Sequence, residues 1–178
     1  MPETVAIIGA GPLGRWLALA AARAGFLVLL EDVMPANLHH AQEWLRQELG
    51  PDALPEIKLV STIEDAVREA DLAIDCVPDE LESKLEILWL LDRMAPPRTV
   101  LATPTTRLSI TDLASCTYRP EKCIAIAAEA SALTGGGGRE ILLRTTAKTS
   151  RESVELVERF WLRLGFLPTF QPELTPVP

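Results

Sequence analysis

The feature that most constrains this chain is a cluster of glycines near the amino terminus. Residues 9–14 read Gly9-Ala-Gly11-Pro12-Leu13-Gly14, which fits the pattern G-x-G-x-x-G. The pattern alone is weak, but here an apolar run precedes it and a helical periodicity follows from about Leu13 to Ala24. In this setting the first glycine permits a tight turn, the second lets a pyrophosphate approach the backbone, and the third lets the helix pack on the strand. The sequence therefore predicts a dinucleotide site at a helix N-terminus.

An acidic residue lies about 20 positions beyond the glycines, where such sites place the carboxylate that binds a ribose. This residue is Asp32, at the end of the second expected strand, residues 26–30. Its charge would repel a 2′-phosphate, and Val33, Met34 and Pro35 offer no cation in its place. The sequence thus favours NAD over NADP. The alternative is a purely structural glycine turn beside a solvated Asp32.

Strand-like and helix-like segments alternate along the rest of the chain. After the first strand (residues 4–8) and helix, we expect strands at 26–30, 57–60, 72–76, 99–102, 122–127, 141–143 and 166–170, and helices at 35–50, 62–70, 80–94, 109–116 and 149–165. This order favours an α/β fold: a Rossmann-type, doubly wound, mostly parallel sheet in a single domain, residues 1–170. Asp79, Ser109 and Thr149 are the expected caps of three helices. Residues 135–138 predict a flexible glycine loop, and residues 171–178 a loose, proline-rich tail.

Composition excludes several classes of function. The net charge of −8 argues against nucleic-acid and anionic-membrane partners, which need clustered lysine and arginine. The longest apolar run, residues 16–22, is too short to span a bilayer, and the first four residues lack the basic stretch of a signal peptide. Cys76, Cys116 and Cys123 have neither metal-binding nor disulfide spacing. We therefore expect free thiols in a reducing, cytoplasmic setting and no metal site.

The chain also resembles a known family in four segments. They are Ala-Val-Arg-Glu-Ala-Asp-Leu-Ala-Ile-Asp (66–75), Val-Pro-Asp-Glu-Leu-Glu-Ser-Lys (77–84), Leu-Ser-Ile-Thr-Asp-Leu (108–113) and Arg-Pro-Glu-Lys (119–122). Together they resemble the NAD-binding domain of the 3-hydroxyacyl-CoA dehydrogenases, over about residues 4–170. The resemblance implies that Val77, Asp79 and Lys84 lie along the nicotinamide half of the cofactor. Pro78 and Thr103 are further candidate cofactor-binding residues. Asp79 replaces the family's usual Glu with a shorter side chain. Otherwise, Asp79 would be a helix cap and Lys84 a solvated helix residue.

The resemblance fails at the catalytic positions. The family uses a histidine as the base, and a glutamate orients that histidine. In this chain the histidine position falls on Ala127 and the glutamate near Leu142, with Glu140 as a substitute only if the register slips. The family's Ser-Asn-Thr-Ser segment corresponds to residues 103–106, where Pro104 replaces the asparagine. Thr106 keeps the hydroxyl that would bind the substrate oxygen, which makes it the candidate catalytic residue.

Other proton-transferring groups are few. His39 and His40 are the only histidines, and they lie in the helix expected on the adenosine side. Glu129 follows Ala127 by two residues, so on a strand both side chains would share a face. It could serve as a substitute base, although the ordinary pKa of a glutamate is low for that role. The alternative is a solvated loop carboxylate.

Three functions remain open from the sequence. In the family, a helical domain completes the acyl-CoA pocket and forms the dimer, and this chain ends where that domain would begin. The first function is an NAD(H)-binding or redox-sensing module without the usual catalysis. The second is an active NAD-dependent oxidoreductase acting on a hydroxyacyl-CoA or a small hydroxy or keto substrate. The third is an assembly subunit, for example a homo-oligomer, with Trp89 and Trp161 as candidate contacts if they are not core residues.

Overall fold

The computed structural model describes residues 3–50, 57–136 and 138–173, whose strands form one eight-stranded sheet. The order across the sheet is β3-β2-β1-β4-β5-β6-β7-β8. Strands β1 to β6 are parallel, β7 is antiparallel to β6, and β8 is parallel to β7. The strands are β1 (Thr4–Ile8), β2 (Leu27–Glu31), β3 (Ile57–Val60), β4 (Leu72–Asp75), β5 (Val100–Pro104), β6 (Cys123–Ile126), β7 (Glu140–Thr145) and β8 (Leu167–Pro172).

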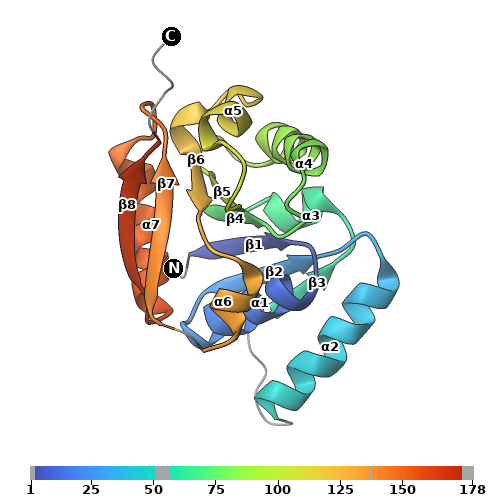
Figure 1. The fold of residues 1–178 in the computed structure, drawn as a ribbon. Helices are drawn as coiled ribbons and strands as arrows, with labels where there is room; N and C mark the ends of the chain where they lie inside the picture. The colour runs from blue at the N-terminus through green and yellow to red at the C-terminus, as the bar shows by residue number, and fades with distance from the viewer. Residues whose placement is uncertain (1–2, 51–56, 137, 174–178) are drawn as a thin grey trace.

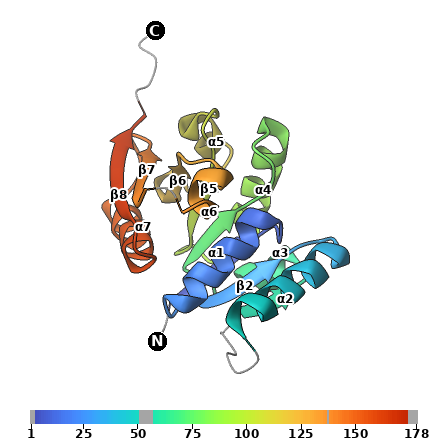
Figure 2. The ribbon, with the colours of Figure 1, turned by 60° about the horizontal axis from the view of Figure 1, so that its bottom comes forward.

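Helices cover both faces of this sheet, which confirms the predicted doubly wound α/β fold (Figures 1 and 2). One face packs against α1 (Pro12–Arg23), α2 (Pro35–Leu49), α6 (Ala130–Thr134) and α7 (Arg151–Arg163). The other face packs against α3 (Ile63–Val67), α4 (Leu81–Met94) and α5 (Ile110–Ser115). A short 3-10 turn, η1 (Pro120–Lys122), precedes β6.

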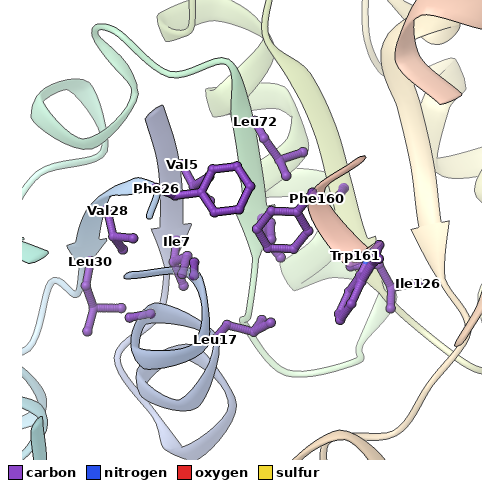
Figure 3. Close-up of a cluster of buried hydrophobic side chains, with 14 of the residues drawn as sticks. Val5, Ile7, Leu17, Phe26, Val28, Leu30, Leu72, Ile126, Phe160 and Trp161 are labelled. Carbon is purple, nitrogen blue, oxygen red and sulfur yellow. The ribbon is translucent and has the colours of Figure 1, made fainter. Parts of the chain in front are cut away.

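The apolar strands are buried on both faces, as continuous apolar runs in parallel sheets predict. In β1, Val5 and Ile7 contribute to one core, while Ala6 and Ile8 contribute to the other. The first core includes an aromatic group in which Phe160 contacts both Phe26 and Trp161 (Figure 3). Trp161 is fully buried, so it is not available as an interface residue.

Several element ends differ from the predictions. The helix expected to reach residue 70 ends at Val67. Glu80, not Asp79, is the N-cap of α4 and makes no side-chain cap bond. Ser109 caps α5 as predicted, whereas α7 is capped by Ser150 rather than Thr149, which instead accepts a bond from the Thr146 N–H. A further short helix, α6, was not predicted and precedes the glycine run at residues 135–138. Residue 137 of that run lies outside the described residues.

The predicted tail is ordered at its beginning. β8 continues to Pro172, and the Glu173 carboxylate accepts bonds from the Ser109 hydroxyl and the N–H groups of Ile110 and Thr111, at the start of α5. Residues 174–178 lie outside the described ranges.

β8 is the outer strand at one end of the sheet (Figure 1). Leu167 N–H donates to Arg139, just before β7, and Glu173 N–H donates to Thr145 on β7. Because parallel strands alternate their bonding direction, Pro168 and Pro172 occupy positions that face the free edge.

Candidate functional site

A cleft of about 560 Å³ lies at the carboxyl ends of four neighbouring parallel strands. The segments that follow β1, β4, β5 and β6 line it, at residues 11–13, 76–79, 104–107 and 128–130. It includes the point between β1 and β4 where the chain reverses its direction across the sheet, which is where open α/β sheets bind ligands. Seven predicted site residues line this cleft: Gly11, Pro12, Leu13, Val77, Pro78, Asp79 and Thr106.

The glycine loop has the geometry that a bound pyrophosphate needs. Gly9 has a φ of 103°, a conformation that favours glycine. A Cβ at Gly14 would collide with the carbonyl oxygen of Gly9, so this position brings α1 close to the loop. At Gly11, by contrast, an added Cβ would meet no atom within 4 Å, and the space lies above the first turn of α1. The N–H groups of Leu13 and Gly14 have no partner within the helix, so they can donate to phosphate oxygens.

Asp32 follows β2, and its carboxylate binds the backbone of the glycine loop at Ala10. Its carboxylate accepts bonds from the Ala10 N–H (2.9 Å), the Met34 N–H (2.8 Å) and the Asn37 side-chain amide (3.1 Å). It is buried, so the alternative of a solvated Asp32 is wrong. A carboxylate that already accepts backbone bonds keeps its orientation, and its remaining lone pair can accept a ribose hydroxyl.

Glu31 precedes Asp32 and is also buried. Its carbonyl oxygen accepts the Gly9 N–H (2.8 Å), so β2 holds the glycine loop through its backbone as well. Burial, and secondarily the nearby negative charge of Asp32, raise the pKa of Glu31 to about 7. The sequence pattern did not single out Glu31, because a carboxylate that ends an apolar strand has no distinct signature.

A buried ionic network lies beneath the next part of the cleft. Lys84 on α4 is 1% exposed, and its Nζ is 3.3 Å from both carboxylate oxygens of Asp75. Thr103 is 0% exposed and donates its hydroxyl to the same carboxylate (2.7 Å). The Val77 N–H also donates to Asp75 (3.1 Å). Burial raises the pKa of Asp75, and the Lys84 ammonium and the Thr103 hydroxyl oppose this rise.

This network bears on the predictions for Lys84 and Thr103. Lys84 is not a solvated helix residue, because its ammonium group is enclosed with Asp75. Neither Lys84 nor Thr103 lines the cleft, and each uses its polar atom on Asp75, so direct contact with a cofactor does not follow from this arrangement. Lys84 and Thr103 hold the Asp75 carboxylate, and this carboxylate in turn binds the Val77 N–H at the cleft.

Polar groups meet where the β4 and β5 segments face each other across the cleft. Asp79 accepts the Thr106 N–H on Oδ2 (3.3 Å), and Arg107 donates to the Asp79 carbonyl oxygen (3.0 Å). Asp79 Oδ1 is buried and has no hydrogen-bond partner among the described residues. An orphaned carboxylate oxygen at a cleft wall is unfavourable unless a ligand donates to it. The residues therefore fit a ligand that carries hydroxyl groups.

The two residues to which the resemblance assigns the family's acid–base positions are neighbours here. The Ala127 N–H donates to the Leu142 carbonyl oxygen (2.8 Å), so the two residues lie side by side. Their side chains hold no transferable proton. Glu140 is exposed at the start of β7, two residues away from Leu142 along the chain, so the register does not bring it to Ala127.

The other candidate bases are placed differently. β6 ends at Ile126, so Glu129 does not share a strand face with Ala127; it is the exposed N-cap of α6 and lines the cleft. His39 and His40 lie on α2, away from the cleft-lining segments. Among residues 3–50, 57–136 and 138–173, no group of histidine, cysteine and acidic side chains could hold a metal ion. No described helix is long and apolar enough to cross a membrane.

Some residues at the site carry no clear sequence signal. Thr105 is buried, and its hydroxyl accepts the N–H groups of Arg107 and Leu108. Arg144 on β7 donates to the Thr105 carbonyl oxygen (2.8 Å) and approaches Glu173. These contacts join segments that are far apart in the sequence, and they determine how the loop at residues 105–108 presents Thr106 and Arg107 to the cleft.

Comparisons with known proteins agree with this geometry. Residues 4–127 match the family described as 3-hydroxyacyl-CoA dehydrogenase, NAD binding domain. A probable 3-hydroxybutyryl-CoA dehydrogenase of Bacillus subtilis is 33% identical over 135 residues, 68% of this chain and 47% of the relative. An L-carnitine dehydrogenase of Burkholderia mallei is 36% identical over 132 residues, 68% of this chain and 41% of the relative. The chain thus spans less than half the length of these curated relatives.

Solved structures show the same likeness. A 3-hydroxybutyryl-CoA dehydrogenase of Escherichia coli K12 superposes with a TM-score of 0.85 and 27% identity, over 97% of this chain and 38% of the other. The glycine loop, Asp32 and the cleft-lining segments at 11–13, 76–79 and 104–107 lie within the matched family region, whereas residues 128–130 follow it. On these grounds, the chain belongs to the 3-hydroxyacyl-CoA dehydrogenase family and forms its NAD-binding domain.

Proposed function

We propose that this chain binds NAD(H) in the cleft but does not carry out the family's histidine-dependent dehydrogenation. The observation that supports the proposal is the adjacent Ala127–Leu142 pair: the resemblance assigns these residues to the family's acid–base positions, and neither has a titratable side chain. A bound nicotinamide would supply a hydride acceptor or donor. Removing a hydroxyl proton would still require a base, and general-base catalysis contributes about 10²–10⁴ in rate. We place the protein, with its free cysteines, in a reducing compartment such as the cytoplasm.

In this proposal, the cofactor lies along the cleft. Gly9 and Gly14 shape the loop, and Gly11, Pro12 and Leu13 face the pyrophosphate. Asp32 accepts a hydroxyl of the adenosine ribose. Val77, Pro78 and Asp79 face the nicotinamide half, with Asp79 Oδ1 as the acceptor that a ribose hydroxyl would satisfy. Lys84 and Thr103 act through Asp75 by holding the β4 turn in place.

Calorimetric titration with NAD⁺, NADH and NADPH tests the binding half of this proposal. We expect NAD⁺ and NADH to bind and NADPH to bind at least about tenfold more weakly, because Asp32 repels its 2′-phosphate. Asp32→Asn is the matched variant and should narrow that difference. The absence of binding at millimolar NAD⁺ and NADH would refute the proposal.

Restoring the two missing groups tests the catalytic half. The natural chain should bind NADH yet oxidise it no faster when acetoacetyl-CoA or small keto acids are added. The Ala127→His, Leu142→Glu double variant should raise that rate about 100-fold or more, as a positioned base requires. Ala127→Gln, Leu142→Gln is the control, since it is polar but cannot transfer a proton near neutral pH. Turnover by the natural chain that equals the double variant would contradict the proposal.

A second candidate is an active NAD-dependent oxidoreductase for a hydroxyacyl-CoA or a small hydroxy or keto substrate. The observation that favours it is the hydrogen bond from the Thr106 N–H to the Asp79 carboxylate. Thr106, which carries the candidate hydroxyl, thus lies beside a carboxylate in the cleft. Steady NADH oxidation with such a substrate, lost in Thr106→Val but not in Thr111→Val, would support it.

A third candidate is an assembly subunit. Leu81 and Trp89 on α4 are exposed apolar side chains and could form an interface. Trp161 is buried, so it is not an interface candidate. Light scattering that reports a monomer at all concentrations would exclude the homo-oligomer.

A further inference from the structure

The two walls of the cleft differ in chemistry. The wall formed by residues 11–13 and 76–79 belongs to the proposed cofactor site. The opposite wall, residues 104–107 and 128–130, contributes mainly apolar and backbone surface, together with Thr106, Arg107 and Glu129. Arg107 is the one cationic side chain among the residues that line this cleft. The cleft, about 560 Å³ in volume, therefore has a single cation, and it lies on the wall opposite the proposed cofactor site.

Hydrogen bonds hold both the backbone and the side chain of Arg107 in place. The buried Thr105 hydroxyl accepts its backbone N–H (3.4 Å), and its Nη2 donates to the Asp79 carbonyl oxygen (3.0 Å). Its side chain makes no ion pair within 4.0 Å among the described residues, although Asp79 and Glu129 also line the cleft. One edge of the guanidinium is thus used on a neutral carbonyl, and donors on the rest of the group remain for a ligand. An arginine fork of this kind binds carboxylates in two parallel hydrogen bonds.

We propose that Arg107, with the Thr106 hydroxyl beside it, forms a subsite for a small molecule that carries a free carboxylate. The inference rests on the proposed function, because the cofactor defines the wall that faces this subsite. The ligand is a free acid rather than a thioester, since a thioester has no carboxylate for the fork. Glu129 at the rim opposes the anion, and the solvent around this exposed side chain screens its charge.

Calorimetry with acetoacetate and methyl acetoacetate tests this subsite, with and without saturating NAD⁺. Neither compound can be reduced by NAD⁺, so only binding is measured. We expect acetoacetate to bind the NAD⁺ complex at least about tenfold more tightly than its ester, as expected for charge-assisted hydrogen bonds. Arg107→Ser should abolish that preference, and Arg107→Lys should keep only part of it. Arg139→Ser removes an exposed arginine outside the cleft and should change nothing. Glu129→Gln should tighten acetoacetate binding.

Other outcomes separate the two proposals. Equal binding of acid and ester, or an unchanged preference in Arg107→Ser, overturns the subsite while NAD⁺ binding persists. If Arg107→Ser instead weakens NAD⁺ itself, Arg107 belongs to the cofactor site and the inference is wrong. Acetoacetyl-CoA that binds as tightly as acetoacetate and depends equally on Arg107 would also overturn it. Acetoacetate that binds through Arg107 without any NAD⁺ binding would refute the proposed function and leave the subsite standing.

Discussion

Gly11 and Gly14 lie three residues apart in one loop, yet the molecule uses them differently. At Gly14 the missing Cβ is required by the fold, because the Gly9 carbonyl occupies its place. At Gly11 the space is open and the backbone φ of −68° suits any residue. The two positions therefore separate folding from binding within the same motif.

Alanine at these two glycines should affect different properties, stability at Gly14 and NAD⁺ affinity at Gly11. Gly14→Ala should lower the free energy of unfolding by about 1–3 kcal/mol, because the loop or α1 must shift to relieve the overlap. Gly11→Ala should lower it by at most about 1 kcal/mol, because the position has no steric conflict and loses only the N-cap preference for glycine, while weakening NAD⁺ binding. Urea unfolding and calorimetry measure the two quantities. A destabilised Gly11→Ala with normal affinity would contradict this assignment.

Glu31 should make stability depend on pH. Its folded pKa of about 7 lies above the value of 4.5 expected in the unfolded chain, so folding favours the protonated form. The free energy of unfolding is therefore highest below pH 4.5, falls between pH 4.5 and about 7, and is level above that range as far as Glu31 is concerned. Glu31→Gln should remove this decline, which is worth at most roughly 3 kcal/mol. Urea unfolding of both proteins at pH 5 and pH 8 measures it, and an equal pH dependence in the two would count against it.

At the scale of elements, the end of β8 and the start of α5 are joined by one carboxylate. Glu173 accepts three hydrogen bonds there and lies 3.8 Å from Arg144. Burial raises the pKa of Glu173, but the Thr111 N–H, the Ser109 hydroxyl and the Ile110 N–H outweigh it, so the net pKa is lowered. Because Arg144 also holds Thr105, this contact links the last strand to the loop that carries Arg107.

Loss of that carboxylate should loosen both elements. Glu173→Ala should cost about 1.5–3 kcal/mol of unfolding free energy, the usual range for hydrogen bonds to a charged group. Since the folded pKa is depressed, the contribution is present above pH 4.5 and is lost as the pH falls through the folded pKa. Hydrogen exchange at the Ile110 and Thr111 amides should accelerate at neutral pH. Glu152→Ala, an exposed glutamate on α7, is the control; an equal loss there would argue against a specific role.

The elements themselves are largely predictable, while the contacts between them are not. The apolar runs locate β1, β2, β4, β5 and β6 within two residues, because strands buried in the sheet leave a continuous signature, and β3 has its predicted bounds although it is less buried. The resemblance predicts that Ala127 and Leu142 correspond to the family's catalytic positions, and a backbone bond joins these two residues. The buried state of Lys84 could not be predicted, since its partner Asp75 lies on another element. The contacts of Glu173 could not be predicted for the same reason, since its partners at the start of α5 are more than 60 residues away in the sequence. Residues 171–173 are therefore expected, from the sequence, to belong to a loose tail.

At the scale of the whole molecule, folding and cofactor binding are coupled through the β1–β4 region. Asp32, Glu31 and the β4 turn hold the cleft walls, so a ligand there binds the folded chain and not the unfolded one. NAD⁺ at 100 times its dissociation constant should raise the free energy of unfolding by about 2.7 kcal/mol. Thermal unfolding with and without NAD⁺ measures this, and Gly11→Ala should show a smaller increase at the same concentration. An equal increase in that variant would place the binding elsewhere.

The prolines on β8 have a consequence for how copies of this protein meet. An outer strand normally exposes a row of N–H groups that can recruit a strand from another molecule. Here Pro168 and Pro172 leave Phe170 as the one residue of β8 with an amide hydrogen directed outward. A neighbouring chain would therefore find too few donors to continue the ladder. Crowded solutions of this protein are protected at that edge against stacking into extended sheets, however much apolar surface its helices expose.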